Sequence, residues 1–309
     1  MRAFDKIVVV TRKTRLEELI ERFNTRGQAK FYLTHAGGDF AEYEQEDDTY
    51  RRALDQVVSS LELGPKVQLV DRGFVPTFLF APEDLVVTLG QDGLVANTAK
   101  YVGAQPIVAV NPDPARFDGV LLPFGAAQAR VAVQRVLAAS AQVREVTLAE
   151  ATLSDGQRLL AFNELFLGAH SHVSSRYRIE VAGCAEPQSS SGVIVSTGAG
   201  STGWVSSVFN MARGVTAMMG GETPPKEPRL PWEDERLWYV VREPFVSRHS
   251  QASIVAGLLE AGHELTLESS MPSGGVIFSD GVEVDFLQFN SGATAHVRAA
   301  RHKARLVVG

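Results

Sequence analysis

Cysteine is almost absent from this chain. Its 309 residues include one cysteine, Cys184, so an intramolecular disulfide and a cysteine-rich metal site are both excluded. We interpret Cys184 as a small, semi-buried apolar residue. A chain of this length corresponds to about two domains and can bury a large core without disulfides.

The chain also lacks an excess of basic residues and any long hydrophobic run. The 30 Lys and Arg residues face 36 Asp and Glu residues, and the formal net charge is -6. This balance does not argue for a nucleic-acid-binding surface. No apolar stretch approaches the length that spans a bilayer. The first apolar run, Ile7–Val10, is too short for a signal peptide and is better explained as a buried strand. We therefore expect a cytoplasmic protein without nucleic-acid or membrane partners.

Two catalytic motifs are absent. The chain has neither G-x-S-x-G, which marks many serine hydrolases, nor the phosphate-loop motif G-x-x-x-x-G-K-[ST]. His170 and His172 form a histidine pair without a third ligand nearby, so a solvated loop explains them better than a metal site. No protein metal site is predicted.

The first part of the chain alternates strands with helices. Apolar runs predict four strands: Ile7–Val10, Val67–Val70, Leu85–Leu89 and Ile107–Val110. The first is a continuous apolar run, as a strand covered on both faces should be. Thr14 and Glu17 form a capping-box pattern at the start of one helix. Further helices are predicted near residues 54–61, 94–101 and 126–139. This order predicts a mostly parallel sheet.

The second part is rich in strands, and we expect the domain boundary near residue 125. Nine strands are predicted, at residues 145–153, 158–166, 177–181, 192–196, 237–242, 253–258, 264–268, 276–280 and 282–286. Ser154-Asp155-Gly156 has the composition of a hairpin turn. One helix is predicted, at Thr202–Ala212. The proline-rich segment Glu222–Glu235 is expected to be an exposed loop.

The first candidate site is the GQDG loop, Gly90–Gly93. It follows a predicted parallel strand and precedes a helix, where glycines let backbone N–H groups approach a phosphate. Asp92 stands at the carboxyl end of a parallel strand, where open α/β sheets bind ligands. It could accept a proton from a hydroxyl nucleophile. An ordinary turn with an N-capping aspartate is the alternative.

The second candidate is the glycine loop, Gly198–Gly203, between a strand and a helix. It matches the spacing of the dinucleotide fingerprint G-x-G-x-x-G. Its surroundings do not match, because that fingerprint needs a following parallel strand that ends in an acid, about twenty residues on. We interpret it as a nucleotide-facing loop of another kind. A plain glycine turn is the alternative.

The third candidate is the Asn-Glu pair, Asn163 and Glu164, which interrupts an apolar strand. Side chains alternate between the faces of a strand, so one member of the pair should point inward. A buried polar group needs a partner, and the ribose hydroxyls of a ligand would serve. A strand end or a bulge is the alternative.

Taken in order, these segments resemble the NAD kinase family. That family has a GGDG loop, an Asn-Glu pair, a serine- and threonine-rich loop, and a late Asp-Gly, which here is Asp280-Gly281. The chain most resembles the mitochondrial-type branch of that family. The matching segments are spread over nearly the whole chain and are residues 8–15, 110–114, 118–119, 162–168, 174–176, 190–192 and 242–244.

The resemblance implies an α/β plus β-rich fold, as in NAD kinases and diacylglycerol kinases. Residues 1–125 would form a parallel-sheet α/β domain with the GQDG loop. Residues 126–309 would form a β-sandwich-like NAD-binding domain, with the last residues able to pack back on the first. It also implies NAD and ATP as substrates, Mg²⁺ or another divalent metal as cofactor, and a homodimer or homotetramer.

The resemblance further implies roles for individual residues. Asp92 would be the catalytic base for the adenosine ribose 2′-hydroxyl. The residues implied in phosphate or ATP binding are Gly90, Gln91, Gly93 and Asn111. Those implied in NAD binding are Asn163, Glu164, Thr202, Gly203, Trp204 and Ser207. Phosphoryl transfer depends mainly on positioning and charge neutralisation.

Two positions depart from the family pattern. Gln91 stands where the family has glycine, and Ser191 stands where many bacterial members have an aspartate that reaches a neighbouring subunit's NAD.

Two alternatives to NAD kinase activity follow. One is a related kinase that phosphorylates a lipid or a sugar, since fold does not fix function. The other is a nucleotide-binding sensor that has lost turnover.

Overall fold

The chain folds into two compact units. The structure, a computed structural model, describes residues 4–222 and 229–309. The first unit comprises Met1–Arg144 and Arg305–Gly309, and the second comprises Glu145–Ala304. Helix α5 (Ala129–Leu137) belongs to the first unit because Ala129, Ala132 and Val133 join its core. The units therefore divide after α5, at residue 144 rather than near residue 125.

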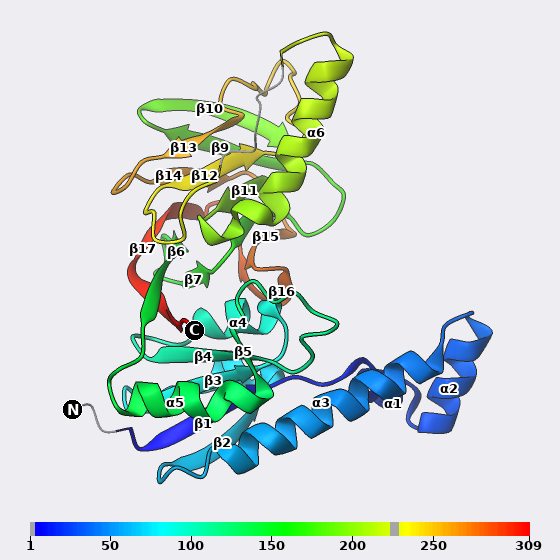
Figure 1. Cartoon of the computed structure of the whole chain (residues 1–309). Helices are drawn as coiled ribbons and strands as arrows, with labels where there is room; N and C mark the ends of the chain where they lie inside the picture. Colours follow the sequence, from blue (N-terminus) through cyan, green and yellow to red (C-terminus); the bar gives the residue numbers. More distant parts are fainter. Residues whose placement is uncertain (1–3, 223–228) are drawn as a thin grey trace. The chain divides into compact units, whose positions relative to one another are not determined.

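A parallel sheet forms the centre of the first unit (Figure 1). Its main strands are β1 (Lys6–Thr11), β2 (Lys66–Asp71), β3 (Asp84–Leu89) and β4 (Pro106–Asn111). They run parallel in the order β2-β1-β3-β4, and the end of β17 (Thr294–Val307) continues the sheet beyond β4. The short strand β5 (Phe124–Gly125) also pairs with β4. All residues of β3 and β4 are buried, which confirms the predicted parallel sheet.

Four further helices belong to the first unit. They are α1 (Arg15–Phe23), α2 (Arg26–His35), α3 (Phe40–Ser60) and α4 (Asp92–Ala99). The predicted capping box is confirmed, because Thr14 and Glu17 exchange side-chain and backbone hydrogen bonds at the start of α1. Short 3-10 helices span Arg72–Thr77 and Ala126–Gln128.

Helix α2 and the first half of α3 were not predicted. The reason lies in the buried face of α3, which includes Glu46 and Asp47 as well as apolar residues. A helix whose buried face is partly charged lacks the apolar periodicity that reveals helices in sequence. These carboxylates are buried because arginine and threonine side chains bind them.

The second unit is a β-sandwich. One antiparallel sheet has the order β13-β12-β11-β8-β15-β16, and strands β10, β9, β14 and β17 pair side by side in the other. Their bounds are β8 (Glu164–Ala169), β9 (Ser175–Val181), β10 (Cys184–Ser190), β11 (Val193–Ser196), β12 (Leu237–Val241), β13 (Ala256–Leu259), β14 (Leu265–Ser269), β15 (Gly275–Ser279) and β16 (Val282–Gln288).

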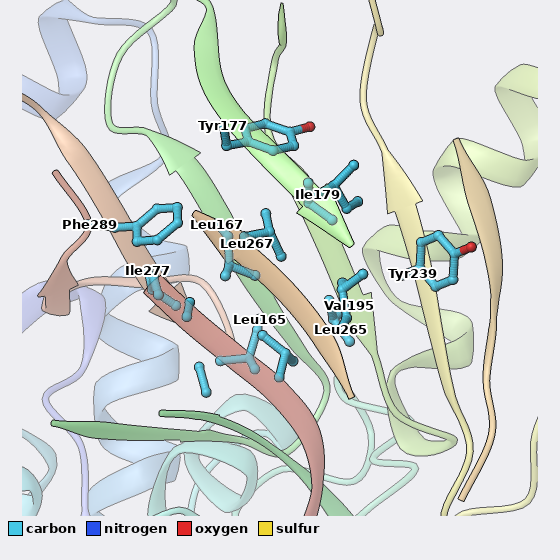
Figure 2. Packing of buried hydrophobic residues seen from close by; sticks show 14 of the residues in the cluster. Leu165, Leu167, Tyr177, Ile179, Val195, Tyr239, Leu265, Leu267, Ile277 and Phe289 are labelled. Atoms are coloured by element: carbon cyan, nitrogen blue, oxygen red, sulfur yellow. The ribbon is translucent and has the colours of Figure 1, made fainter. Parts of the chain in front are cut away.

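Both sheets of the second unit contribute to one core (Figure 2). Leu165 and Leu167 come from β8, whereas Ile179 comes from β9 and Leu267 from β14, and all four are fully buried. The alternation of buried and exposed residues along β9 is typical of a strand with one face in such a core. A fold with a parallel-sheet α/β part and a β-sandwich part is thus confirmed.

One predicted strand is wrong. The segment expected as a single strand over residues 158–166 is two strands, β7 (Arg158–Ala161) and β8. The chain leaves the strand conformation between them because the backbone N–H groups of residues 162–164 bind the Asp280 carboxylate. The predicted hairpin turn is confirmed, since β6 (Val143–Leu153) pairs with β7 and Gly156 has a φ of +89°.

Other expectations need correction or lie outside the described part. Strands β10 and β17 were missed, the first because Pro187 and polar residues interrupt its apolar pattern. Cys184 is exposed rather than semi-buried, because it begins the edge strand β10. Residues 223–228 of the proline-rich segment lie outside the described residues. Among the described helices, none is long and apolar enough to cross a membrane.

Candidate functional site

The candidate site residues form one group in each unit. In the first unit, the GQDG loop connects β3 to α4. Gln91 is exposed, takes the N-cap position of α4 with a φ of -91°, and makes no side-chain capping bond. At Gly90 the space is tight, because a Cβ there would lie 2.7 Å from Leu94 Cδ2 and the Leu94 side chain would have to shift. A Cβ on Gly93 would meet no atom within 4 Å, so that position is open.

The Asp92 carboxylate is bound by a neighbouring loop. Leu121 donates its backbone N–H to Oδ1 at 2.8 Å, and Val120 donates its N–H to Oδ2 at 3.2 Å. Asp92 is the first residue of α4, so it is not the N-cap that the alternative interpretation required. Two backbone donors fix the orientation of the carboxylate, and each oxygen keeps a lone pair for a further partner. These two donors could not be identified from the sequence.

Asn111 shapes the loop that carries these donors. It ends β4 and is buried, its Oδ1 accepts from the Asp113 N–H, and its Nδ2 donates to the Phe117 carbonyl. Gly119 has a φ of +62°, and a Cβ there would lie 2.9 Å from Asn111 Nδ2. The contacts of Asn111 are therefore with its own loop, and one amide hydrogen is left for a ligand.

In the second unit, Asp280 organises the Asn-Glu pair. Its carboxylate accepts the backbone N–H groups of Phe162 at 2.9 Å, Asn163 at 2.6 Å and Glu164 at 3.2 Å. The Asp280 N–H in turn donates to the Glu164 carbonyl at 3.0 Å. The late Asp-Gly of the sequence thus lies directly at the Asn-Glu pair, which is where β7 ends and β8 begins.

The Glu164 carboxyl group is buried and incompletely bound. Its Oε2 is buried and has no hydrogen-bond partner among the described residues. Burial raises the pKa of Glu164, the Asp280 charge raises it further, and the Trp204 N–H lowers it, so that it stands at about 7. A buried oxygen without a partner is well suited to accept a hydrogen bond from a ligand hydroxyl.

The glycine loop lies against the Asn-Glu pair. A Cβ on Gly200 would lie 2.2 Å from the Asn163 carbonyl oxygen, and a Cβ on Gly203 would lie 3.1 Å from Glu164 Oε2. Thr197 N–H donates to the Asn163 carbonyl at 2.9 Å. Gly200 is required by its close approach to the backbone of Asn163, whereas a Cβ on Gly203 would need only a small shift of the Glu164 side chain.

The last residues predicted for NAD binding follow the glycine loop. Thr202, Gly203 and Ser207 are exposed. Trp204 begins α6 (Trp204–Met218) and is partly buried, with its ring stacked on Phe166 at a centroid distance of 5.6 Å. The Arg242 guanidinium lies 5.1 Å from the same ring. Sequence reasoning treated Arg242 only as part of a matching segment and did not pair it with Trp204.

The described residues form no cluster of metal-ligating side chains. Over residues 4–222 and 229–309, no group of three His, Cys, Asp or Glu side chains is arranged to hold a metal ion. His170 is exposed, and its Nδ1 lies 3.3 Å from the Gly274 carbonyl oxygen. The carboxylate of Asp92 is an oxygen donor of the type that Mg²⁺ uses together with substrate phosphates.

Comparison with solved structures identifies the fold. A scan against protein-family models and a search of curated proteins each found no match. Yeast NADH kinase, solved in complex with NADH, aligns over 98% of this chain and 83% of its own with a TM-score of 0.58 and 17% identity. An NAD kinase from Archaeoglobus fulgidus, in complex with ATP, aligns over 97% and 93% with a TM-score of 0.55 and 15% identity. The chain therefore has the fold of these NAD(H) kinases.

Proposed function

We propose that this protein is an NAD kinase, which transfers a phosphoryl group from ATP to the adenosine ribose 2′-hydroxyl of NAD and produces NADP. The observation that carries the proposal is the convergence in the second unit. Segments far apart in sequence, Asn163-Glu164, the glycine loop and Asp280, meet around one buried, unpartnered carboxylate oxygen. The similarity of the fold to two NAD(H) kinases supports it.

Recognition of the acceptor is assigned to the Asn-Glu pair. An ionised carboxylate accepts hydrogen bonds more strongly than a neutral carboxyl group, and ribose hydroxyls are donors of the right kind. Glu164 Oε2 would accept from a ribose hydroxyl, and Asn163 would contribute amide donors and an acceptor. The exposed residues Thr202, Gly203 and Ser207 would line the nucleotide, with Trp204 beside its adenine end.

The chemical step is assigned to the GQDG loop. Asp92 would accept the proton of the 2′-hydroxyl as its oxygen forms a bond to the γ-phosphorus and the bond to ADP breaks. Gly90 and Gly93 would leave room for the donor phosphates, Gln91 would offer its amide, and Asn111 would hold the loop. A divalent metal, when bound beside Asp92, would neutralise phosphate charge.

Some parts of the proposal rest on the sequence alone. We propose that the two units are the two domains of the kinase, the first binding the phosphoryl donor and the second binding NAD. The matching segments favour the mitochondrial-type branch. A cytoplasmic location and assembly into a homodimer or homotetramer also stay predictions.

The test is direct. The purified chain is incubated with ATP, Mg²⁺ and NAD, and in parallel with NADH, and the phosphorylated dinucleotide is separated and identified. We expect NADP to form, and the Asp92→Asn variant to form almost none. Binding of NAD without any product would support the sensor. Neither binding nor product would support a kinase for a lipid or sugar, and either result would overturn the proposal.

A further inference from the structure

Three arginine side chains surround one buried carboxylate in the first unit. Arg12 Nη2 lies 3.1 Å from Glu46 Oε1, and Arg15 Nε lies 2.5 Å from Glu46 Oε2. Arg116 Nη1 lies 3.8 Å from the same Oε2. Burial raises the pKa of Glu46, but the two nearer arginines outweigh it and hold the pKa below its usual value. Glu46 is therefore ionised at neutral pH.

The arginines carry more charge than this carboxylate balances. The neighbouring acids are engaged elsewhere, because Arg51 binds both Asp47 and Glu17. Arg12 Nε and Arg15 Nη2 are buried and have no hydrogen-bond partner among the described residues. Charged donors buried without acceptors are unfavourable, so this arrangement suits an additional anion.

The side chains are held in place before any anion arrives. The Arg12 guanidinium lies 5.2 Å from the ring centre of Tyr50, whose hydroxyl accepts the Arg12 backbone N–H at 3.0 Å. The Arg15 guanidinium lies 4.4 Å from the ring centre of Tyr43. Both tyrosines belong to α3, which also carries Glu46. Fixed guanidinium groups lose less conformational freedom when they bind a ligand.

The arginine cluster lies beside the GQDG loop. A Cβ on Gly90 would lie 3.6 Å from Arg12 Cδ. Arg12 directly follows β1, Gly90 directly follows β3, and Arg116 lies in the loop after β4. These three strands are parallel neighbours, so their carboxyl ends share the sheet edge where open α/β sheets bind ligands (Figure 1).

We propose that Arg12, Arg15 and Arg116 bind the phosphate chain of the phosphoryl donor, which is either a nucleoside triphosphate or an inorganic polyphosphate. Guanidinium groups bind phosphate oxygens in pairs and keep their charge in a buried site. The statement that the bound anion is the phosphoryl donor rests on the proposed function. The anion site rests only on the charge and geometry of the cluster.

The test uses the full chain and inorganic tripolyphosphate, measured by calorimetry and by thermal shift. Arg116→Gln removes the arginine farthest from Glu46 and should therefore fold. We expect it to weaken tripolyphosphate binding roughly ten- to a hundred-fold, as the loss of one charge-assisted contact predicts. Arg116→Lys should keep most of the affinity. The control is Arg52→Gln, because among the described residues Arg52 bonds only within its own helix, to Asp48 and Thr49.

The outcomes separate this inference from the proposed function. Equal binding by wild type and Arg116→Gln, equal losses in Arg116→Gln and Arg52→Gln, or no binding by wild type would each overturn the site. If NADP still forms when any of these results is found, the proposed NAD kinase activity holds and the proposed anion site is wrong. Arg116-dependent binding without NADP formation would support the anion site and overturn the kinase. ATP titrated in parallel shows which donor the site prefers.

Discussion

Asp280 binds the backbone N–H of Glu164 at 3.2 Å, and its charge raises the pKa of the Glu164 carboxyl group. Asp280 thus both fixes the position of the Asn-Glu pair and shifts the ionisation of Glu164. Since burial acts in the same direction, Glu164 is half-protonated at about pH 7. Binding of a ligand hydroxyl to this carboxylate should therefore depend on pH near neutrality.

We expect the affinity for NAD to fall as the pH falls through about 7. The ionised Glu164 accepts a hydroxyl hydrogen bond more strongly than the neutral form, so mass action with a pKa of about 7 predicts binding up to roughly tenfold weaker at about pH 6 than at about pH 8. Calorimetric titration of NAD across this range measures it. Glu164→Gln should bind NAD more weakly at high pH and show no such dependence. A pH dependence that persists in the variant would assign it to another group.

Glu164 should give the free energy of unfolding a pH dependence opposite to that of NAD binding, so that the protein becomes less stable as the pH rises. The folded-state pKa of about 7 lies above the ordinary glutamate pKa of 4.5, so the folded protein binds more protons between these pH values. The stabilisation from the neutral form is complete below about 4.5 and is lost as the pH rises through 7. Denaturant unfolding of wild type and Glu164→Gln should diverge with pH by an amount of order 2–3 kcal/mol. Parallel curves would contradict the assignment.

Asp280→Asn should change both the backbone position of the Asn-Glu pair and the ionisation of Glu164. The amide has one oxygen acceptor instead of a carboxylate, so at least one of the three backbone bonds is lost, at about 1 kcal/mol. Removing the negative charge should also lower the pKa of Glu164 and move the pH dependence of NAD binding to lower pH. A purely structural role for Asp280 would reduce stability and leave the midpoint of that dependence unchanged.

Asp92→Asn should abolish turnover and leave the fold intact. A correctly placed base contributes about two to four orders of magnitude in rate. The amide nitrogen cannot accept the Val120 or Leu121 N–H, so a local loss of about 1 kcal/mol is expected as well. Single-turnover NADP formation and NAD titration measure the two effects separately. Activity within tenfold of wild type would show that Asp92 is not the base.

Gln91 should prove to be accommodated. A positive φ at this position would have strained a non-glycine residue, but the φ of -91° is ordinary backbone and the side chain is exposed. Gln91→Gly should therefore lower the free energy of unfolding by roughly 0.5–1 kcal/mol through added chain entropy. We expect the affinities for ATP and NAD to change less than about fivefold, since one hydrogen bond contributes only about a kcal/mol. A large gain in ATP affinity would show that the side chain does obstruct the phosphates.

Two glycines near and in α6 offer a matched pair. Gly200→Ala places a methyl group 2.2 Å from the Asn163 carbonyl oxygen, whereas Gly214→Ala, within α6, meets nothing within 4 Å. We expect the first to destabilise by about 2 kcal/mol or more and to weaken NAD binding. The second should stabilise by roughly 0.5–1 kcal/mol. Thermal unfolding of both variants measures the two effects on stability. Equal effects would show that Gly200 is not required by its close approach to the Asn163 carbonyl oxygen.

The sequence alone determined the elements whose signal is local. The apolar runs predicted β1, β3 and β4, the Thr14–Glu17 spacing predicted the start of α1, and Ser154–Gly156 predicted a turn. The motif segments also indicated candidate site residues, among them Asn163 and Glu164, which the structure places beside Asp280. Each of these signals lies within a few residues of chain, because periodicity, capping and turn chemistry act at that range.

The way in which distant residues meet follows from the tertiary structure. Asp280 reaches Glu164 across 116 positions of sequence, and Arg116 reaches the buried Glu46 on a helix whose apolar pattern is incomplete. Neither contact leaves a local pattern, because the partner that allows a charged group to be buried comes from elsewhere in the fold. The kind of residue at each site was therefore readable from the sequence, whereas its partners, and with them its ionisation, were set by folding.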